Sequence, residues 1–330
     1  MQRLIWCVLL AFAIALALGP VVIPWLKKMK FGQNINELGP ATHKVKQGTP
    51  QMGGIIFMGA MALVPVVLHK SGTGWTYIPV AIICILGFGA IGFVDDFIKI
   101  KMKRSLGLTP KQKMIPQLAL SVGLAVWAYF EVGSSLTVPF IGVEWDLGWL
   151  FIPFMVFVLV GTVNSANLLD GCDGLLAGCS MIDFITLALI TLLMFQGATG
   201  AEAEGYYNLT LVCGACAGAL LGFLRYNSHP ANVFMGDSGS FAIGGAIAAV
   251  VLCTRLTLLL PLIGICMMTS SLSVIIQVCY FKATHGKRIF KMSPLQHHFE
   301  LSGMPETHVV SMYYIVTAIV CLVALTGFTA

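Results

Sequence analysis

Residues 77–96 read YIPVAIICILGFGAIGFVDD, an apolar run that ends in two adjacent aspartates. Its length matches the roughly 20 residues that a helix needs to cross the hydrocarbon core of a bilayer. Similar continuous runs recur along the chain, in which 58% of the 330 residues are hydrophobic and only 10% are charged. Soluble domains carry roughly 25% charged residues, and the strands of a membrane β-barrel would alternate in polarity. The sequence therefore predicts an all-α integral membrane protein.

Ten membrane-spanning helices and a single domain over residues 1–330 are expected, because no repeat or low-complexity linker divides the chain. The expected spans cover residues 3–26, 53–69, 77–94, 114–132, 149–164, 176–196, 207–224, 238–254, 257–281 and 309–328. The ninth is long enough to tilt or break. Residues 15–17 in the first span imitate a signal-peptide cleavage site. However, Lys27, Lys28 and Lys30 follow the apolar run, which is typical of a retained helix.

The positions of Lys and Arg predict the orientation of the chain. Of the 19 such residues, all except Arg3, Lys70 and Arg255 fall on one side of the expected spans. The positive-inside rule makes that side cytoplasmic and puts both termini outside. The net charge of +5 then follows from topology and predicts no nucleic-acid partner, although single cations could attract an anionic substrate or a lipid headgroup. The ten cysteines are expected to be buried free thiols and not a metal or redox site.

Acidic residues and histidines gather at the cytoplasmic ends of the expected spans. They are Asp95 and Asp96 after the third span, Asp170 and Asp173 after the fifth, Asp237 at the start of the eighth, and His297 and His298 in the last cytoplasmic loop. Each alone has an ordinary explanation, such as a solvated helix end or a favourable interaction with the helix dipole. Together they are costly at the edge of the hydrocarbon unless they are paired, hydrated or bound to a cation. Several carboxylates on one face indicate a hard cation such as Mg²⁺. If their segment is helical, Asp170 and Asp173 share a face.

Glycines and cations beside these acids are suited to phosphate groups. Gly171 and Gly236 would allow close approach of the backbone to a phosphate. A Gly-rich stretch at residues 48–54 follows Lys46. Lys99, Lys111 and Lys113 border the Asp95-Asp96 pair, although solvated loops are the ordinary interpretation of such cations. Mg²⁺ and phosphates at a membrane surface indicate phosphoryl transfer, with a lipid phosphate as one reactant.

In this order the segments resemble the polyprenyl-phosphate N-acetylhexosamine-1-phosphate transferases, over nearly the whole chain. The matching motifs are residues 48–54 (GTPQMGG), Asp95-Asp96, residues 167–174 (NLLDGCDG), residues 236–240 (GDSGS) and residues 294–300 (PLQHHFE). The resemblance implies Mg²⁺-dependent transfer of phospho-MurNAc-pentapeptide from UDP-MurNAc-pentapeptide to undecaprenyl phosphate. This reaction gives lipid I and UMP in peptidoglycan synthesis. The resemblance also implies a location in the bacterial cytoplasmic membrane and a homodimer.

The same resemblance implies roles for single residues. Asp237 would hold Mg²⁺, and Asp95 and Asp96 would act at the reacting phosphates, with Asp95 as the candidate base. His297 and His298 would act at the sugar-peptide end of the donor. The residues implied in substrate binding are Lys46, Lys99, Lys111, Asn167, Asp170, Asp173, Asn227, Phe234, Gln277 and Gln296, with the ring of Phe234 stacking on uracil.

One position departs from the family pattern. Gln296 stands where the family usually has the first of three consecutive histidines. Glutamine is not protonated near neutrality, so acid–base chemistry at this position is excluded. Two mechanisms stay open. In one, the lipid phosphate attacks the β-phosphate of the donor in line; in the other, an aspartate first forms a covalent intermediate. The one-step route is favoured because the lipid phosphate is already an anionic nucleophile.

Two other functions are compatible with parts of the sequence. A sister enzyme that uses UDP-GlcNAc as its donor would differ in the last cytoplasmic loop. An ion-coupled transporter would place acids near the middle of the membrane and often shows inverted repeats. Asp183 lies inside an expected span, but near its inner end, and the sequence shows no repeat. These observations favour the transferase.

Overall fold

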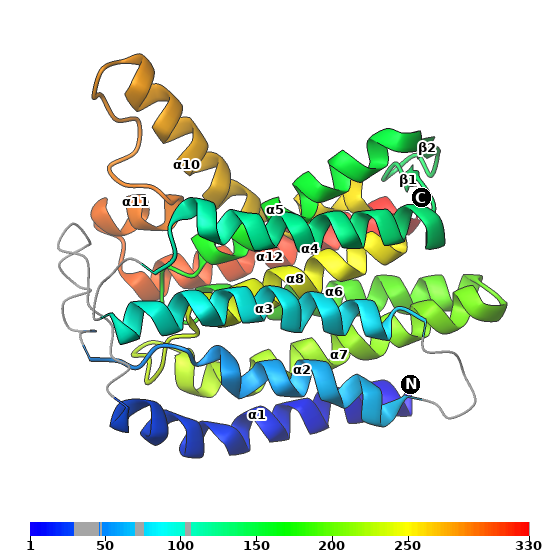
Figure 1. Ribbon diagram of the computed structural model, residues 1–330, viewed down its shortest axis with the longest axis horizontal. Coiled ribbons are helices and arrows are strands. Elements are labelled where there is room, and N and C mark those ends of the chain that lie inside the picture. Colours follow the sequence, from blue (N-terminus) through cyan, green and yellow to red (C-terminus); the bar gives the residue numbers. More distant parts are fainter. Residues whose placement is uncertain (30–45, 47, 70–75, 103–106, 330) are drawn as a thin grey trace.

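Long helices lie side by side along most of the chain in the computed structural model, which describes residues 1–29, 46, 48–69, 76–102 and 107–329 (Figure 1). They are α1 (Gln2–Lys28), α2 (Gly54–Leu68), α3 (Ile78–Lys101), α4 (Pro110–Glu131), α5 (Phe151–Leu169), α6 (Leu175–Gly197), α7 (Gly200–Asn227), α8 (Gly236–Thr254), α10 (Ile265–Ala283) and α12 (Glu306–Thr329), with the shorter α11 (Leu295–Leu301) before the last. Within these described residues, nine helices are long and apolar enough to cross a membrane. The prediction of an all-helical, multi-pass membrane protein is therefore confirmed.

Two of the ten expected spans differ from the others. The second corresponds to α2, which has only 15 residues and is shorter than the roughly 20 that cross a bilayer without tilt or thinning. The ninth is broken. A 3₁₀ turn, η3 (Thr257–Leu259), and the short α9 (Leu260–Ile263) precede Gly264, after which α10 begins. α10 then projects away from the other long helices (Figure 1).

α8 lies at the centre of the bundle because its small residues let neighbouring helices approach closely. A Cβ at Gly245 would lie 2.6 Å from the carbonyl oxygen of Cys84 in α3. A Cβ at Gly244 would lie 2.6 Å from the Cα of Val163 in α5. Close contacts between small residues favour helix association in membranes, where no hydrophobic effect drives one helix against another. The three helices that carry Asp95, Asn167 and Asp237 are therefore held in direct contact.

The two chain termini lie at one end of the bundle, and α11 lies at the other (Figure 1). Near the C-terminus, a short antiparallel hairpin joins α4 to α5. It pairs β1 (Ser135–Thr137) with β2 (Glu144–Asp146), and Ser135 lies opposite Asp146. The backbone N–H of Phe140 at the hairpin turn donates to Gly327 O in α12 at 2.8 Å. The apolar pattern did not predict this hairpin.

Candidate active site

Two aspartates on α3 and one on α8 meet where the two helices pack together. α3 continues past the expected end of its span, so that Asp95 and Asp96 lie within the helix. Asp237 lies in the first turn of α8. The helices approach closely because position 92 is glycine, where a Cβ would collide with the backbone of Asp237. One carboxylate oxygen from each aspartate lies within 4.8 Å of the other two. The structure thus brings these three acids together, while their chemical roles stay predictions.

A hydrogen-bond donor holds each of the three carboxylates. The bonds are Leu108 N to Asp95 Oδ1 at 2.8 Å, Ser238 N to Asp96 Oδ2 at 2.9 Å, and Asn167 Nδ2 to Asp237 Oδ1 at 2.8 Å. Asn167 also donates to Ser240 Oγ at 2.9 Å. It does so from inside α5, because this helix runs to Leu169 and not only to residue 164 as expected. The carboxylates are therefore fixed in orientation before any substrate binds.

Two lysines lie against these carboxylates. Lys99 Nζ is 2.7 Å from Asp95 Oδ2 and 3.0 Å from Asp237 Oδ2. Lys113 Nζ is 2.6 Å from Asp237 Oδ2 and lies over the ring of Phe241, 4.6 Å from its centroid. The contact between Lys99 and Asp95 Oδ2 is an ion pair without hydrogen-bond geometry. The two ammonium groups thus offset part of the negative charge that a cation would otherwise compensate.

Lys111, which the family resemblance implies in substrate binding, is exposed in the first turn of α4. Thr109 fixes the start of this helix, because its Oγ accepts a hydrogen bond from Gln112 N. From that start, Lys113 and not Lys111 reaches the carboxylates. Lys113 and Gln117 are four residues apart and share one helix face, and Gln117 is fully buried. That spacing is the sequence signal that could have selected Lys113.

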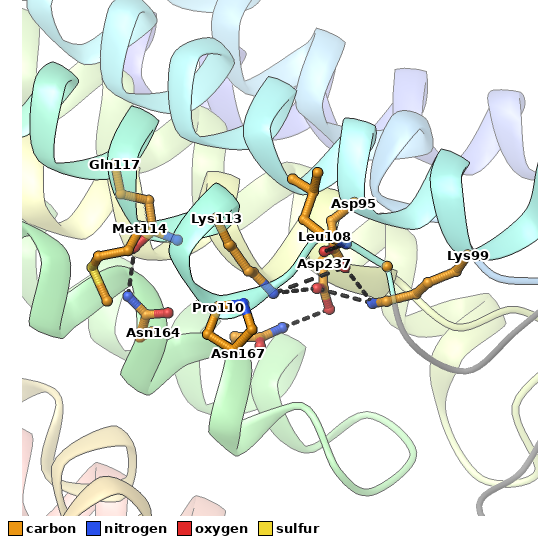
Figure 2. A pocket seen from close by; sticks show the side chains of 11 residues that line it. Asp95, Lys99, Leu108, Pro110, Lys113, Met114, Gln117, Asn164, Asn167 and Asp237 are labelled. Carbon is orange, nitrogen blue, oxygen red and sulfur yellow. Dashed lines mark hydrogen bonds and ion pairs between the residues drawn. The ribbon is translucent and has the colours of Figure 1, made fainter.

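A cavity of about 400 Å³ opens beside the carboxylates (Figure 2). Its lining residues are Asp95, Lys99, Gly107, Leu108, Pro110, Lys113, Met114, Gln117, Asn164, Asn167 and Asp237. Asn164 Nδ2 donates to Val160 O at 2.8 Å and to Gln117 Oε1 at 2.7 Å. Because Gln117 Oε1 accepts this bond, the remaining polar atom of the amide is Nε2, which is buried without a hydrogen-bond partner among the described residues. Carboxylates, ammonium groups and an amide donor together suit phosphates bound with a divalent cation.

Lys46 joins two distant parts of the chain. Its Nζ lies 2.7 Å from Asp173 Oδ1 and 2.6 Å from Glu306 Oε1. His229 Nδ1 lies 3.3 Å from the other oxygen of Asp173. Burial lowers the pKa of Lys46, but hydrogen bonds to the two carboxylates outweigh burial, so that the pKa is raised and the ammonium stays charged. Glu306 was missed by the sequence analysis because only the fold brings it near Asp173.

The loop between α5 and α6 is not helical. α5 ends at Leu169 and α6 begins at Leu175, so that Asp170 and Asp173 do not share a helix face. Gly174 has a φ of +77°, a conformation that glycine adopts readily, and it turns the chain into α6. The expectation that Asp170 and Asp173 share a face required a helical segment, and the segment is a loop.

Asn227 and Phe234 lie close to the Lys46 ion pairs. Asn227 Oδ1 accepts from Gly174 N at 3.2 Å, and its Nδ2 donates to Val233 O at 3.0 Å. The ring centroid of Phe234 lies 6.0 Å from Lys46 Nζ. Asn227 therefore braces the two loops that present Asp173 and the aromatic ring.

The last loop is tied to the bundle by two glutamines. Gln296 in α11 is fully buried; its Nε2 donates to Leu168 O at 2.8 Å, and its Oε1 accepts from Ser270 Oγ at 3.1 Å. Gln277 in α10 accepts from Phe290 N at 3.0 Å and donates to Phe290 O at 3.1 Å. Both amides are thus engaged within the protein. Direct contact of either glutamine with substrate stays a prediction.

The two histidines of α11 have different surroundings. His297 Nδ1 lies 2.7 Å from Glu300 Oε2. His298 Nδ1 accepts a hydrogen bond from Lys291 N at 3.1 Å, and its ring lies against that of Phe290. His298 therefore also stabilises the loop before α11.

Asp170 gives the protein a stability that depends on pH. Burial raises the pKa of Asp170 to about 8, and the charges of Asp237 and Asp96 add to this shift. An aspartate in an unfolded chain has a pKa of about 3.9. Between about pH 4 and pH 8 the folded protein therefore keeps a proton that the unfolded chain has lost. The stabilisation is complete below about pH 4 and is lost as the pH rises through about 8.

Asp170→Asn keeps the shape of the neutral acid and is expected to remove this loss. The melting temperature of the variant in detergent, relative to that of the unmodified protein, should rise from about pH 5 to pH 8 and stay constant above it. Scanning fluorimetry across this range measures the difference. Parallel profiles of the two proteins would contradict the expectation.

The chain is similar to known proteins of one family. The glycosyl transferase family 4 model matches residues 78–255. The phospho-N-acetylmuramoyl-pentapeptide-transferases of Thermoanaerobacter sp. (strain X514) and Clostridium kluyveri (strain ATCC 8527) are both 47% identical to the chain. The first alignment covers 97% of this chain and 96% of the relative, and the second covers 98% of each. The chain therefore belongs to the phospho-N-acetylmuramoyl-pentapeptide-transferase family, within glycosyl transferase family 4.

Proposed function

We propose that the chain transfers phospho-MurNAc-pentapeptide from UDP-MurNAc-pentapeptide to undecaprenyl phosphate, releasing UMP and forming lipid I. The observation that carries this proposal is the cluster of Asp95, Asp96 and Asp237 with Lys99 and Lys113, beside a cavity in a bundle of apolar helices. Membership of the family agrees with it. UDP-GlcNAc is the competing donor.

The proposal includes a membrane topology. With α2 counted as a short tenth span, one domain crosses the bacterial cytoplasmic membrane, both termini face outward, and the carboxylate cluster lies on the cytoplasmic side. The lysine-rich loops at that side support this orientation. A homodimer is part of the proposal by family resemblance only.

The residues at the cluster fit Mg²⁺. The three aspartates offer an oxygen-only donor set within 4.8 Å, as a hard cation requires. Asp95 Oδ2 is buried and accepts no hydrogen bond among the described residues, and the ion pair with Lys99 Nζ at 2.7 Å is the contact that a cation would replace. Asp237 is the residue that we assign to the cation, with Asp95 and Asp96 beside it. Mg²⁺ bound there would neutralise the diphosphate and polarise its phosphorus–oxygen bonds.

The lysines beside the three aspartates, together with Lys46 and Phe234, would position the two substrates. Lys99 and Lys113 would exchange their carboxylate contacts for phosphate oxygens when the substrates enter the cavity. The ring of Phe234 would stack on the uracil, and Lys46, whose Nζ lies 6.0 Å from the centroid of that ring, would bind the diphosphate. His297 would bind the sugar-peptide end. In this proposal the β-phosphate of the donor would lie between the uridine site and the lipid phosphate.

We favour the one-step reaction. An oxygen of the lipid phosphate forms a bond to the β-phosphorus, and the bond from that phosphorus to the bridging oxygen breaks, so that UMP leaves with the oxygen. Both oxygens of Asp95 are engaged, by Leu108 N and by Lys99, which weakens that carboxylate as a nucleophile. The second pKa of a phosphate monoester is about 6, so most of the lipid phosphate is already a dianion near neutral pH. Asp95 would have to accept a proton only from the fraction that is still protonated.

The test is UMP release by the purified full chain in detergent with undecaprenyl phosphate. UDP-MurNAc-pentapeptide and UDP-GlcNAc are supplied separately, each with and without Mg²⁺. We expect UMP only with the muramyl donor and only with Mg²⁺. UMP from UDP-GlcNAc alone would reassign the donor, and no UMP from either donor with folded protein would reject a transferase.

A further inference from the structure

Three side chains of different chemistry meet beside α11. Cys172 comes from the loop between α5 and α6, and His297 and Glu300 lie three residues apart on one face of α11. Cys172 Sγ is 3.6 Å from Glu300 Oε2, and the same oxygen is 2.7 Å from His297 Nδ1. One sulfur, one nitrogen and one oxygen thus lie within 4.8 Å of one another.

We propose that Cys172, His297 and Glu300 form a binding site for a borderline divalent cation of the Zn²⁺ class, and that an occupied site inhibits the transferase. A thiolate, an imidazole and a carboxylate are the ligands that Zn²⁺ takes in proteins. Mg²⁺ prefers oxygen ligands alone, so this site differs in metal preference from the three aspartates. Three protein ligands would leave the fourth position for water.

One of the distances between the ligand atoms fits a tetrahedral ion, and a second would have to lengthen. For usual Zn²⁺ bond lengths, a sulfur and an oxygen ligand lie about 3.5 Å apart, and a nitrogen and an oxygen ligand about 3.3 Å. The observed sulfur–oxygen distance is 3.6 Å. The nitrogen–oxygen distance of 2.7 Å would have to open by about half an ångström. This lengthening is expected when a metal ion replaces the proton between His297 Nδ1 and Glu300 Oε2.

Gly171 holds the imidazole in place. A Cβ at this position would lie 2.7 Å from His297 Nε2, so the ring sits directly against the loop that carries Cys172. With Nε2 on that side, Nδ1 is the atom that faces Glu300. The imidazole is therefore oriented toward the carboxylate with which it would share the ion.

Cys172 is a neutral thiol in the metal-free protein. Burial raises the pKa of Cys172 well above its ordinary value, and the nearby charge of Glu300 adds to the shift. Zn²⁺ deprotonates a coordinating thiol outright, so binding would release the Cys172 proton to solvent. No local sequence pattern marks this cysteine as a metal ligand, because its two partners lie more than a hundred residues away along the chain.

An ion at this site would act on the donor end of the active site. It would fix α11 to the loop between Asp170 and Asp173 and would withdraw His297 from the sugar-peptide end. The inhibition rests on the proposed function, whereas the binding of the ion does not. The two parts can therefore be tested separately.

Metal binding is tested with Co²⁺ as a spectroscopic substitute, added to chelator-treated full-length protein in detergent. A Co²⁺–thiolate charge-transfer band in the near ultraviolet is expected in the unmodified protein and should disappear when Zn²⁺ is added. Cys172→Ser should lack the band. Cys279→Ser should keep it, because this variant removes an exposed thiol on α10. A missing band in the unmodified protein, or a band that persists in Cys172→Ser, would overturn the site.

Inhibition is tested in the UMP assay at saturating Mg²⁺. Zn²⁺ should lower the rate of UMP release by the unmodified protein about tenfold, which is within the usual range of coupling between two sites. The rate of Cys172→Ser with Zn²⁺ should stay within about twofold of the rate of the same variant without Zn²⁺. Equal inhibition of both proteins would place the inhibitory ion elsewhere and overturn the regulatory part. If neither protein released UMP without Zn²⁺, the proposed function would fail, while the Co²⁺ spectra would still decide the site.

Discussion

Asp237→Asn is expected to lower UMP release about 10³-fold, because the change removes several kcal/mol of charge stabilisation and each 1.36 kcal/mol is a factor of about ten. Asp237 lies where Lys99, Lys113 and Asn167 converge, at 3.0, 2.6 and 2.8 Å. An amide of the same shape can still accept the bond from Asn167. It cannot supply the negative charge that the cation and the two ammonium groups require. Steady-state UMP release across a Mg²⁺ titration measures the loss.

Asp146→Asn is the matched control, since it makes the same chemical change at an exposed residue of the hairpin between α4 and α5. Its rate should stay within about twofold of the unmodified protein, as expected for a surface substitution. If folded Asp237→Asn kept more than a tenth of the activity, Asp237 would not be the residue that holds the cation.

The sequence was sufficient for the membrane class and for the grouping of the acids. Apolar runs of bilayer length allow few structures other than helices, because every backbone polar group must be satisfied within the membrane. Acids at corresponding ends of neighbouring spans must then lie at one face. The sequence thus predicts one face for Asp95, Asp96 and Asp237 along with Asp170 and Asp173, and in the structure the first three have carboxylate oxygens within 4.8 Å of one another.

The finer features depended on contacts that no local pattern encodes. Glu306 reaches Lys46 across 260 positions of sequence, which only the fold brings together. α3 and α5 run beyond their apolar segments because Lys99 and Asn167 find partners on α8. A tilt or a break in the ninth expected span was predicted from its length, but the position of the break at Gly264 was not. Lys99 and Asn167 are thus stable within the ends of their helices because α8 supplies their ion-pair and hydrogen-bond partners.

Gln296 shows how the structure explains a departure from the family pattern. Its amide donates to Leu168 O in α5 and accepts from Ser270 Oγ in α10, so that it ties α11 to two helices. Neither hydrogen bond needs a proton to be gained or lost, which agrees with the exclusion of acid–base chemistry at this position. The neighbouring His297 and Glu300 keep their own contact on the same short helix.

Lys113→Met is expected to lower kcat/KM for UMP release about 10²-fold, whereas Lys111→Met should stay within about twofold. Methionine keeps an unbranched apolar stem and removes only the charge. At position 113 that charge lies 2.6 Å from Asp237 Oδ2 and faces the cavity (Figure 2). At position 111, two residues earlier, the side chain is exposed.

The two variants show which lysine contacts the substrates: Lys111, which the family resemblance implies, or Lys113, which the fold places at the carboxylates. Both residues lie in the first turn of α4, so an effect of charge on the fold or on membrane insertion would be similar in the two variants. A specific loss in Lys113→Met therefore reports the contact with the reacting phosphates. A larger loss in Lys111→Met would mean that α4 turns its other face to the substrates, and the Thr109 cap would then not set the register of this helix.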